Sequence, residues 1–140
     1  MATSEDAAQS LSIGEVAERT GLSVHALRFY EREGLLTGPV QRTSGGRRRY
    51  TSVDVEWLLI CVKLRESGMP LADLKHFAEL VRHGPGNEAE RLHLLDTHRQ
   101  RVDAQIQALE ECRSVITWKV AVYTEHLARG AADGLWDPTT

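Results

Sequence analysis

The sequence lacks the features that mark several large classes of protein. It has only two cysteines, Cys61 and Cys112, which give no disulfide framework and suit a reducing cytoplasm. No apolar run reaches the roughly 18 residues of a membrane-spanning helix. The acidic segment Met1–Ser10 is unlike a signal peptide and is expected to be a disordered tail. We therefore expect a cytoplasmic protein made of one or two small folded units.

Signatures of catalysis and of metal binding are missing too. The sequence contains no nucleophile with a placed base, no phosphate-binding loop, and no paired carboxylates beyond those that helix faces explain. His76 with His83, and His93 with His98, lack the accompanying Cys or carboxylate spacing of a known metal site. The prediction is a protein that is not an enzyme and that needs no cofactor or metal.

An overall excess of positive charge is also absent, since the net charge is −3. The charges are, however, unevenly distributed. Residues 19–49 hold seven arginines against two glutamates, a balance of +5, whereas residues 51–140 hold ten Lys or Arg and fourteen Asp or Glu, a balance of −4. An arginine cluster alone can be solvated surface, but within a DNA-binding motif it is the footprint of phosphate contact.

The segment SVHALRFYEREG predicts a short helix with one polar face. Ser23 can cap its start, and Gly34 is a natural stop. His25 and Arg28 share a face opposite Leu27. Donors on such a face, on a helix that follows another helix and a glycine turn, are typical of a helix that reads the major groove.

The flanking residues predict a winged helix-turn-helix. Ser12 and Glu15 have capping-box spacing, so a first helix should run to about Thr20. After the second helix, two short arms surround a Gly-rich turn at residues 43–46 and predict a β-hairpin. The arginines of Arg47–Tyr50 suit a wing that lies along phosphates.

These residues resemble the DNA-binding domain of MerR-type transcription regulators. The resemblance continues through Asp54, the segment Leu64–Met69 and a long last helix, and so covers nearly the whole chain. The matching motifs are Ile13–Gly14–Glu15–Val16–Ala17, Leu27–Arg28–Phe29–Tyr30–Glu31, Gly34–Leu35–Leu36 and Arg48–Arg49–Tyr50.

Taken together, the polar face, the wing and the resemblance select the expected DNA-contacting residues. The resemblance implies that Tyr30 is a phosphate-contacting aromatic residue, and Phe29 stands where relatives frequently have Tyr. The expected DNA-binding residues are Ser23, His25, Arg28, Phe29, Tyr30, Arg42, Arg47, Arg48, Arg49 and Tyr50.

Two further helices are expected after the wing. Thr51 or Ser52 can cap the third helix, and Pro70 suits the first position of the fourth, which should end near Gly84. The expected inward-facing residues are Val53, Trp57, Cys61 or Ile60, and Leu64 in the third helix, and Leu71, Leu74, Ala78 and Val81 in the fourth.

The last helix, residues 87–127, is expected to be about 60 Å long and to carry a coiled-coil seam. Positions spaced three and four apart recur over about five heptads. Such a stripe needs a partner helix, so we expect a homodimer, and the resemblance implies antiparallel helices. Arg99 and Arg113 interrupt the seam, and its apolar members include Leu92, Leu95, Val102, Ile106, Leu109, Ile116, Val120 and Tyr123.

One cysteine and three aromatic residues are the candidates for a sensor role. Cys61 lies in an apolar run and is expected to be a core residue, whereas the sensor thiol of some relatives falls at the position of Lys63. Trp118, Tyr123 and Trp136 are candidates for lining the pocket of a small organic effector, or for simple packing at the end of the coil.

The predicted organisation is a tail at residues 1–10, a winged helix-turn-helix with connecting helices at 11–83, a coiled-coil dimerisation helix at 87–127 and a tail at 128–140. The resemblance implies a homodimeric regulator that binds a palindromic promoter operator. It also implies that the regulator distorts the promoter spacer, so that RNA polymerase can engage both promoter elements. Alternatives are a simple repressor, a DNA-bending accessory protein of the excisionase type, and a coiled-coil interaction module.

Overall fold

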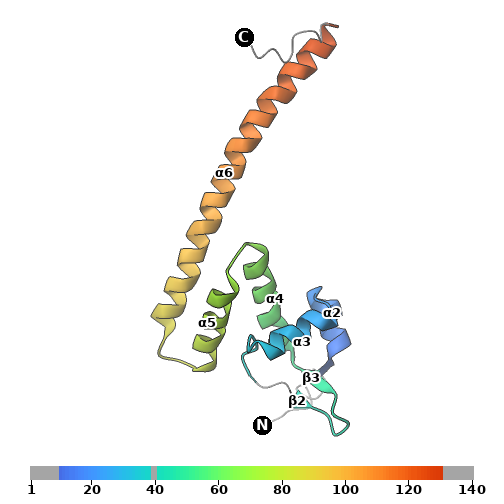
Figure 1. The fold of residues 1–140 in the computed structure, drawn as a ribbon, viewed down its shortest axis with the longest axis vertical. Helices are drawn as coiled ribbons and strands as arrows, with labels where there is room; N and C mark the ends of the chain where they lie inside the picture. The colour runs from blue at the N-terminus through green and yellow to red at the C-terminus, as the bar shows by residue number, and fades with distance from the viewer. Residues whose placement is uncertain (1–9, 39–40, 131–140) are drawn as a thin grey trace. The chain divides into compact units, whose positions relative to one another are not determined.

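The computed structural model describes residues 10–38 and 41–130, which form mainly helices and one small sheet (Figure 1). This confirms the predicted mainly α fold with a winged helix-turn-helix and a long final helix. The predicted tails at residues 1–10 and 128–140 lie almost entirely outside the described residues. In chain order the elements are β1 (Leu11–Ser12), α2 (Ile13–Thr20), α3 (Val24–Arg32), β2 (Gln41–Arg42), β3 (Arg48–Tyr50), α4 (Ser52–Glu66), α5 (Leu71–Arg82) and α6 (Glu88–Ala128).

The chain divides into two compact units, residues 1–98 and 99–140. The boundary between these units falls inside α6. Leu94 and Leu95 pack against the core of the first unit, and His98 is buried. The first turns of α6 therefore belong to the first unit, which we call the head. None of the described helices is long and apolar enough to cross a membrane.

Side-chain caps start α2 and α4 where the sequence predicts. Ser12 Oγ accepts from the Glu15 amide at 3.2 Å, and the Glu15 carboxylate accepts from the Ser12 amide at 3.3 Å. Thr51 and Asp54 form the same reciprocal pair at the start of α4, with N–O distances of 3.2 and 2.8 Å. Each pair satisfies two amides that a helix start leaves without partners.

The wing is part of a three-stranded antiparallel sheet with the order β1-β3-β2. Leu11 lies opposite Tyr50, and Arg42 lies opposite Arg48. The sequence predicted only the two arms of the hairpin. The extra strand, β1, joins the hairpin to the start of α2, so the wing is attached to the helices on one side through β3. On the other side β2 is an edge strand.

The core of the first unit lies where α2, α3, α4 and α5 meet. Its fully buried side chains include Val16, Leu27, Leu35, Leu58 and Leu74. Trp57 stacks on Phe77 of α5 with ring centroids 5.5 Å apart. Leu27 contributes α3, the helix that the sequence predicts to read the major groove, to this core.

The predicted inner face of α4 is partly wrong. Val53 and Ile60 are 65% and 49% exposed, whereas Val55 and Leu58, which the prediction omitted, are buried beside Trp57 and Cys61. The helix contacts α2 and α5, so its buried face is broad. Because apolar residues occur around much of α4, periodicity alone did not identify the face that packs.

In α5 the predicted stripe is confirmed, with a shift of one residue at the start. Pro70 precedes the first helical residue and occupies the cap position without a side-chain bond. Leu74 and Ala78 are fully buried, and Leu71 and Val81 pack partly buried against the core.

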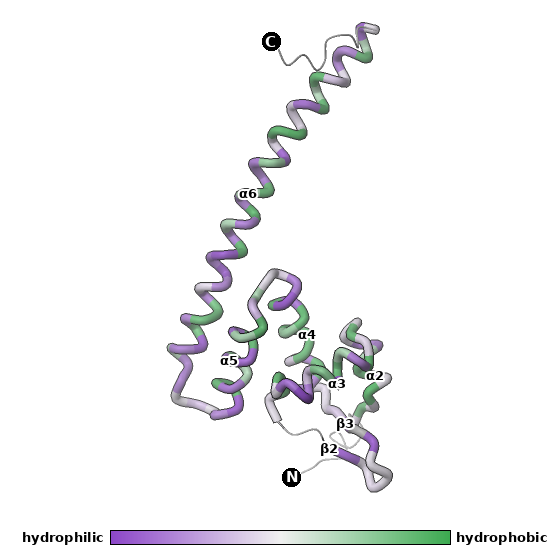
Figure 2. The backbone as a smooth tube through the Cα atoms, viewed as in Figure 1, coloured by the Kyte–Doolittle hydropathy of each residue, from purple (hydrophilic) through white to green (hydrophobic). Residues whose placement is uncertain are grey.

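The second unit is the distal part of α6. Apolar residues recur along it among polar ones (Figure 2). No described residue beyond His98 is buried within this chain. The exposed seam residues include Ile106, Leu109, Ile116, Val120, Tyr123 and Leu127.

Candidate nucleic-acid interface

The reading helix α3 is fixed at its start by the turn from α2. Gly21 adopts a φ of +77°, a conformation that favours glycine. The buried Thr20 hydroxyl donates to the Val16 carbonyl at 2.7 Å and accepts from the Leu22 amide at 3.2 Å. Ser23 Oγ then accepts from the Ala26 amide at 3.0 Å. The start and direction of α3 are thus set by local hydrogen bonds.

Two of the predicted reading residues are on the accessible face of this helix. His25 and Arg28 are exposed, whereas Leu27 is only 1% exposed and packs in the core. This is the two-faced helix that the sequence predicts. Ser23 is exposed as well, but its hydroxyl is engaged in the cap.

The end of α3 forms a left-handed glycine stop. Gly34 has a φ of +70°. The Gly34 amide donates to the Glu31 carbonyl at 3.2 Å, and the Leu35 amide donates to the Tyr30 carbonyl at 2.9 Å. This pair of bonds is the Schellman arrangement, which satisfies carbonyls that a helix end would otherwise leave open.

Donors from α4 and α5 hold the segment that follows this stop. The Trp57 indole N–H donates to the Leu35 carbonyl at 2.7 Å. The Arg82 guanidinium donates to the Leu36 carbonyl at 2.8 Å and also to the Gly34 carbonyl. Three successive carbonyls are therefore bound by side chains from two other helices.

An ion pair adds a further link between the end of α3 and α5. Lys75 Nζ lies 2.6 Å from a carboxylate oxygen of Glu33. The hydrogen bond from Lys75, followed by its charge, lowers the pKa of Glu33 below the ordinary glutamate value. Both side chains are more than one-third exposed, so water screens the pair and its contribution to stability is small.

The wing turn is closed by its own hydrogen bonds. The Thr43 amide donates to the Arg47 carbonyl at 2.8 Å, and the Gly46 amide donates to the Thr43 carbonyl at 2.9 Å. Arg42 and Arg47 are exposed, and Arg49 is half-buried. Arg48 lies in β3, and its side chain is outside the part of the chain that the structure describes.

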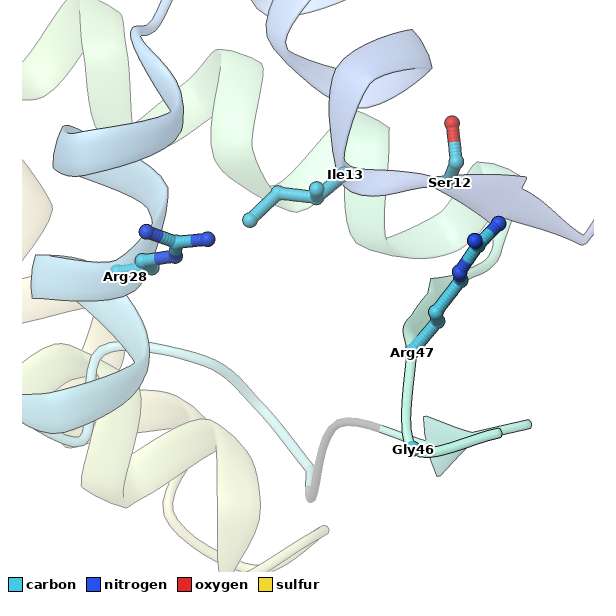
Figure 3. A pocket seen from close by; sticks show the side chains of 5 residues that line it. All are labelled: Ser12, Ile13, Arg28, Gly46 and Arg47. Atoms are coloured by element: carbon cyan, nitrogen blue, oxygen red, sulfur yellow. The ribbon is translucent and has the colours of Figure 1, made fainter. Parts of the chain in front are cut away.

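A cleft of about 290 Å³ opens between the start of α2, the reading helix and the wing. Figure 3 shows the Arg28 side chain directed towards Ile13, and the Arg47 side chain reaching from the wing towards Ser12. Two guanidinium groups on the walls of one open cleft suit an anion such as a DNA phosphate, because arginine can donate two parallel hydrogen bonds to phosphate oxygens.

Three of the predicted DNA-contacting residues have buried or partly buried side chains. Tyr30 is 7% exposed and Tyr50 is 2% exposed, so both rings are part of the core. Burial raises the pKa of the Tyr30 hydroxyl. Phe29 is partly buried and packs edge-to-face with Tyr30 at 6.3 Å between ring centroids. Both side chains therefore contribute mainly to the core, and a phosphate contact by Tyr30 or Tyr50 stays a prediction.

The two cysteines occupy opposite environments. Cys61 is fully buried and Cys112 is exposed. Desolvation raises the pKa of Cys61 from its usual 9.0 to about 12. Its thiol therefore stays protonated at neutral pH, in agreement with the predicted core role.

Three of the histidines considered for metal binding, His76, His83 and His98, form hydrogen bonds within the protein. His98 Nε2 lies 2.8 Å from Ser67 Oγ, and His76 Nε2 lies 3.1 Å from a carboxylate oxygen of Glu90. His83 Nδ1 donates to the backbone carbonyl of its own helix at residue 79, with a distance of 2.7 Å. Within residues 10–38 and 41–130, no group of three His, Cys, Asp or Glu side chains could hold a metal ion.

Of the aromatic residues considered for an effector site, Trp118 and Tyr123 are 60% and 39% exposed on α6. The Lys119 ammonium lies 4.9 Å from the centre of the Trp118 ring. Trp136 lies outside the described residues.

Sequence reasoning missed the residues that support the interface from behind. Trp57, Lys75 and Arg82 contact the end of the reading helix from 22, 42 and 46 or 48 residues further along the chain. Two of them donate to backbone carbonyls, which every residue has. No residue pattern therefore signals these contacts.

Comparison with protein families agrees with this geometry. The family model described as MerR HTH family regulatory protein matches residues 11–80, and a second model, described as MerR, DNA binding, matches residues 55–118. The first match covers the sheet, α2 to α4 and most of α5. The second continues into α6.

Individual proteins give the same result. An uncharacterised HTH-type transcriptional regulator of Haemophilus influenzae is 38% identical over 117 residues, which is 84% of this chain and 86% of that protein. HiNmlR, described as a MerR family regulator lacking the sensor domain and bound to promoter DNA, superposes with a TM-score of 0.80 at 35% identity, over 92% of this chain and 97% of its own. A MerR family regulator from Bacillus thuringiensis superposes with a TM-score of 0.71 at 28% identity, over 81% and 99% of the two chains.

Proposed function

The chain belongs to the MerR family of helix-turn-helix regulatory proteins and is a DNA-binding transcription regulator, and from this premise we propose that it acts as a homodimer on a palindromic promoter operator. The observation that carries the DNA-binding part of the proposal is the cleft lined by Arg28 and Arg47, which come from the reading helix and the wing. HiNmlR, which has the same fold, is described as bound to promoter DNA.

In the proposed complex α3 enters a major groove. His25 and Arg28 reach base edges, because these side chains are exposed on the face opposite the core. Arg47, Arg48 and Arg49 contact the flanking phosphates, with Ser23 and the edge of Phe29 at the margin of the interface. The phosphate contacts fix the position of the protein on the DNA, and the base contacts give sequence preference.

The second half of the operator requires a second reading helix. The exposed apolar stripe of α6, centred on Ile106 and Leu109, supports pairing with α6 of another copy. The family resemblance favours antiparallel helices. A two-fold dimer presents two copies of α3 to two half-sites, so the operator should be an inverted repeat.

For control of transcription, we propose that the dimer bends and untwists the spacer of its promoter, and that RNA polymerase then engages both promoter elements. Deforming a site of this length costs on the order of 1–6 kcal/mol, which the additional clamped contacts must offset. A small organic effector would find exposed aromatic residues in Trp118 and Tyr123, which a dimer would place beside a second chain.

The test is selection of bound duplexes from a random-sequence pool with the full chain, followed by nuclease footprinting and transcription in vitro. We expect enrichment of one inverted repeat and enhanced cleavage at its centre, where DNA is distorted. An inverted repeat without central distortion would indicate a simple repressor. Failure to enrich an inverted repeat would overturn the proposal of a dimer on a palindrome.

A further inference from the structure

Arg42 is a wing residue, but its guanidinium is turned back onto the protein. Nη1 donates to the Gly46 carbonyl at 3.2 Å, and Nη2 donates to Glu31 Oε1 at 3.4 Å. One side chain of β2 therefore contacts both the wing turn and the last turn of the reading helix. We propose that Arg42 and Glu31 form a bridge that sets the position of the wing against α3, so that Arg42 is a positioning residue for DNA binding and not a phosphate contact.

The position of β2 in the sheet explains why such a bridge is useful. β2 has two residues and lies at the edge of the sheet, where it pairs with β3. The hydrogen bonds of the turn, between Thr43, Gly46 and Arg47, make the wing stiff but do not orient it towards α3. The contact between Arg42 and Glu31 joins the wing directly to the reading helix. It therefore fixes the position of the Arg47 guanidinium relative to that of Arg28.

The chemistry of the bridge favours arginine. A guanidinium is planar and carries donors that point in fixed, different directions, so it can serve a carbonyl and a carboxylate at once. A lysine at the same position would keep the charge but offer a single, strongly hydrated ammonium on a flexible stem. The substitution Arg42→Lys would thus preserve the charge and lose the two-way contact.

The bridge also accounts for a carboxylate on a helix that faces DNA. An unpaired glutamate there would repel phosphates, and pairing with Arg42 offsets its charge. The side chains of Arg42 and Glu31 are 48% and 25% exposed, so the pair is partly solvated and its effect on binding should be modest. The sign of the effect is informative. Removing the Glu31 charge should strengthen DNA binding if electrostatics dominates, and weaken it if the bridge positions the wing.

This inference rests on the proposed function and is tested with a duplex selected by the wild-type protein. Fluorescence anisotropy would give Kd at several salt concentrations for Arg42→Ala, Arg42→Lys, Glu31→Gln and the double variant Arg42→Ala/Glu31→Gln. We expect Glu31→Gln to weaken binding by about 3- to 10-fold, Arg42→Lys to lose about as much as Arg42→Ala, and the double variant to be no weaker than Arg42→Ala alone, because both changes remove one shared interaction. The salt slope should stay at its wild-type value.

Two control variants calibrate these measurements. Arg47→Ala removes a proposed phosphate contact and should lower the salt slope by about 1. Glu33→Gln changes the charge of the same helix end equally, but Glu33 pairs with Lys75 and not with the wing. In the double variant Arg42→Ala/Glu33→Gln, the effects of the two substitutions on the free energy of DNA binding should add.

The bridge is overturned if Arg42→Lys binds like wild type, Arg42→Ala lowers the salt slope by about 1, and Glu31→Gln binds more tightly, because Arg42 would then be a phosphate contact. Amide hydrogen exchange of the free protein separates failure of the bridge from failure of the proposed function. Exchange at Gly46 and Arg47 should be faster in Arg42→Ala, and to a smaller extent in Glu31→Gln. Unchanged exchange in both variants would contradict the bridge even if the wild-type protein binds the operator as proposed.

Discussion

The two units of this chain treat their apolar residues in opposite ways. In the first unit, Leu27, Leu58 and Leu74 are at most 1% exposed within the monomer. In the second, Leu109 and Ile116 are 68% and 61% exposed. Both units are helical, so secondary structure does not account for the difference. The head encloses its own core, whereas the distal part of α6 has an apolar stripe and no second element of this chain, among the described residues, to cover it.

The contrast shows that the two units depend on different sources of stability. An isolated helix in water gains little from its own hydrogen bonds and is stabilised mainly by tertiary packing. The head supplies that packing from its own chain. The apolar residues of the second unit are exposed in this chain, which is why dimerisation is proposed at this place. Substitutions of buried residues in the first unit should therefore change the free energy of unfolding, whereas substitutions of apolar residues in the second should change the oligomeric state.

The largest effect is expected for Ile106→Asp, which places a charge in the exposed apolar stripe of the second unit. Two copies of the new carboxylate would be buried against apolar residues in a dimer, at a cost of about 3–5 kcal/mol or more per dimer. Analytical ultracentrifugation should show a monomer or an unfolded chain, and cooperative operator binding should be lost. Gln107→Asp adds the same charge beside the seam and should stay dimeric. If Ile106→Asp also remains dimeric, α6 is not the interface.

The next effect concerns the core of the head. Leu58→Ala opens a cavity at a fully buried position and should lower the free energy of unfolding by about 2–5 kcal/mol in chemical denaturation. Leu59→Ala is a matched control on the same helix, since Leu59 is 41% exposed, and should change stability by less than about 1 kcal/mol. Equal losses for the two variants would show that the inner face of α4 is misassigned.

A smaller effect, confined to DNA, is expected at the reading helix. Arg28→Ala should weaken operator binding by about 1–3 kcal/mol while leaving the dimer and the free energy of unfolding close to wild type, because the side chain is exposed. Fluorescence anisotropy and ultracentrifugation would separate the two properties. Arg101→Ala removes the same charge from α6 and should bind the operator normally. Unchanged binding by Arg28→Ala would count against α3 as the reading helix.

The smallest effect compares one thiol from each unit. Cys112 is exposed and should react with iodoacetamide in the folded protein, whereas Cys61 should react only after unfolding, because its pKa of about 12 leaves almost no thiolate at neutral pH. The folded state favours the protonated Cys61, so this contribution to stability is complete below pH 9.0 and is lost as the pH rises towards 12.

Mass spectrometry of the alkylated peptides would measure the difference in reactivity. Cys61→Ala should cost about 1 kcal/mol through the small cavity that it leaves, should remove the contribution of this thiol to destabilisation at high pH, and should leave any transcriptional response intact. Rapid labelling of Cys61 in the native protein, or loss of the response in Cys61→Ala with normal folding and DNA binding, would indicate a thiol switch in place of a core residue.

Much of the fold could be predicted because the helices carry their own boundary signals. Ser12, Ser23 and Thr51 cap the helices that the sequence assigns to them, and Gly34 ends the reading helix. These signals are local, since each depends on residues within one turn. The strand β1 was missed because two residues are too few to show an alternation of polar and apolar side chains.

The interface was predicted less completely because its details depend on distant contacts. Arg28 and His25 follow from helical geometry, and they are exposed as expected. The burial of Tyr30 and Tyr50 depends instead on how α3 and β3 meet the rest of the core. In the same way, the partners of Arg42 and Arg82 are decided by tertiary structure, because one guanidinium looks like another in a sequence.

The three bound carbonyls that follow the reading helix have a consequence for the speed and selectivity of DNA recognition. Because Gly34, Leu35 and Leu36 are already held by Arg82 and Trp57, α3 would meet the groove in one orientation in the proposed complex. The conformational entropy of this segment is lost during folding, so little of it opposes association, and a mismatched groove cannot be accommodated by bending the helix end. Selectivity then depends on how well the DNA adapts to a stiff protein edge.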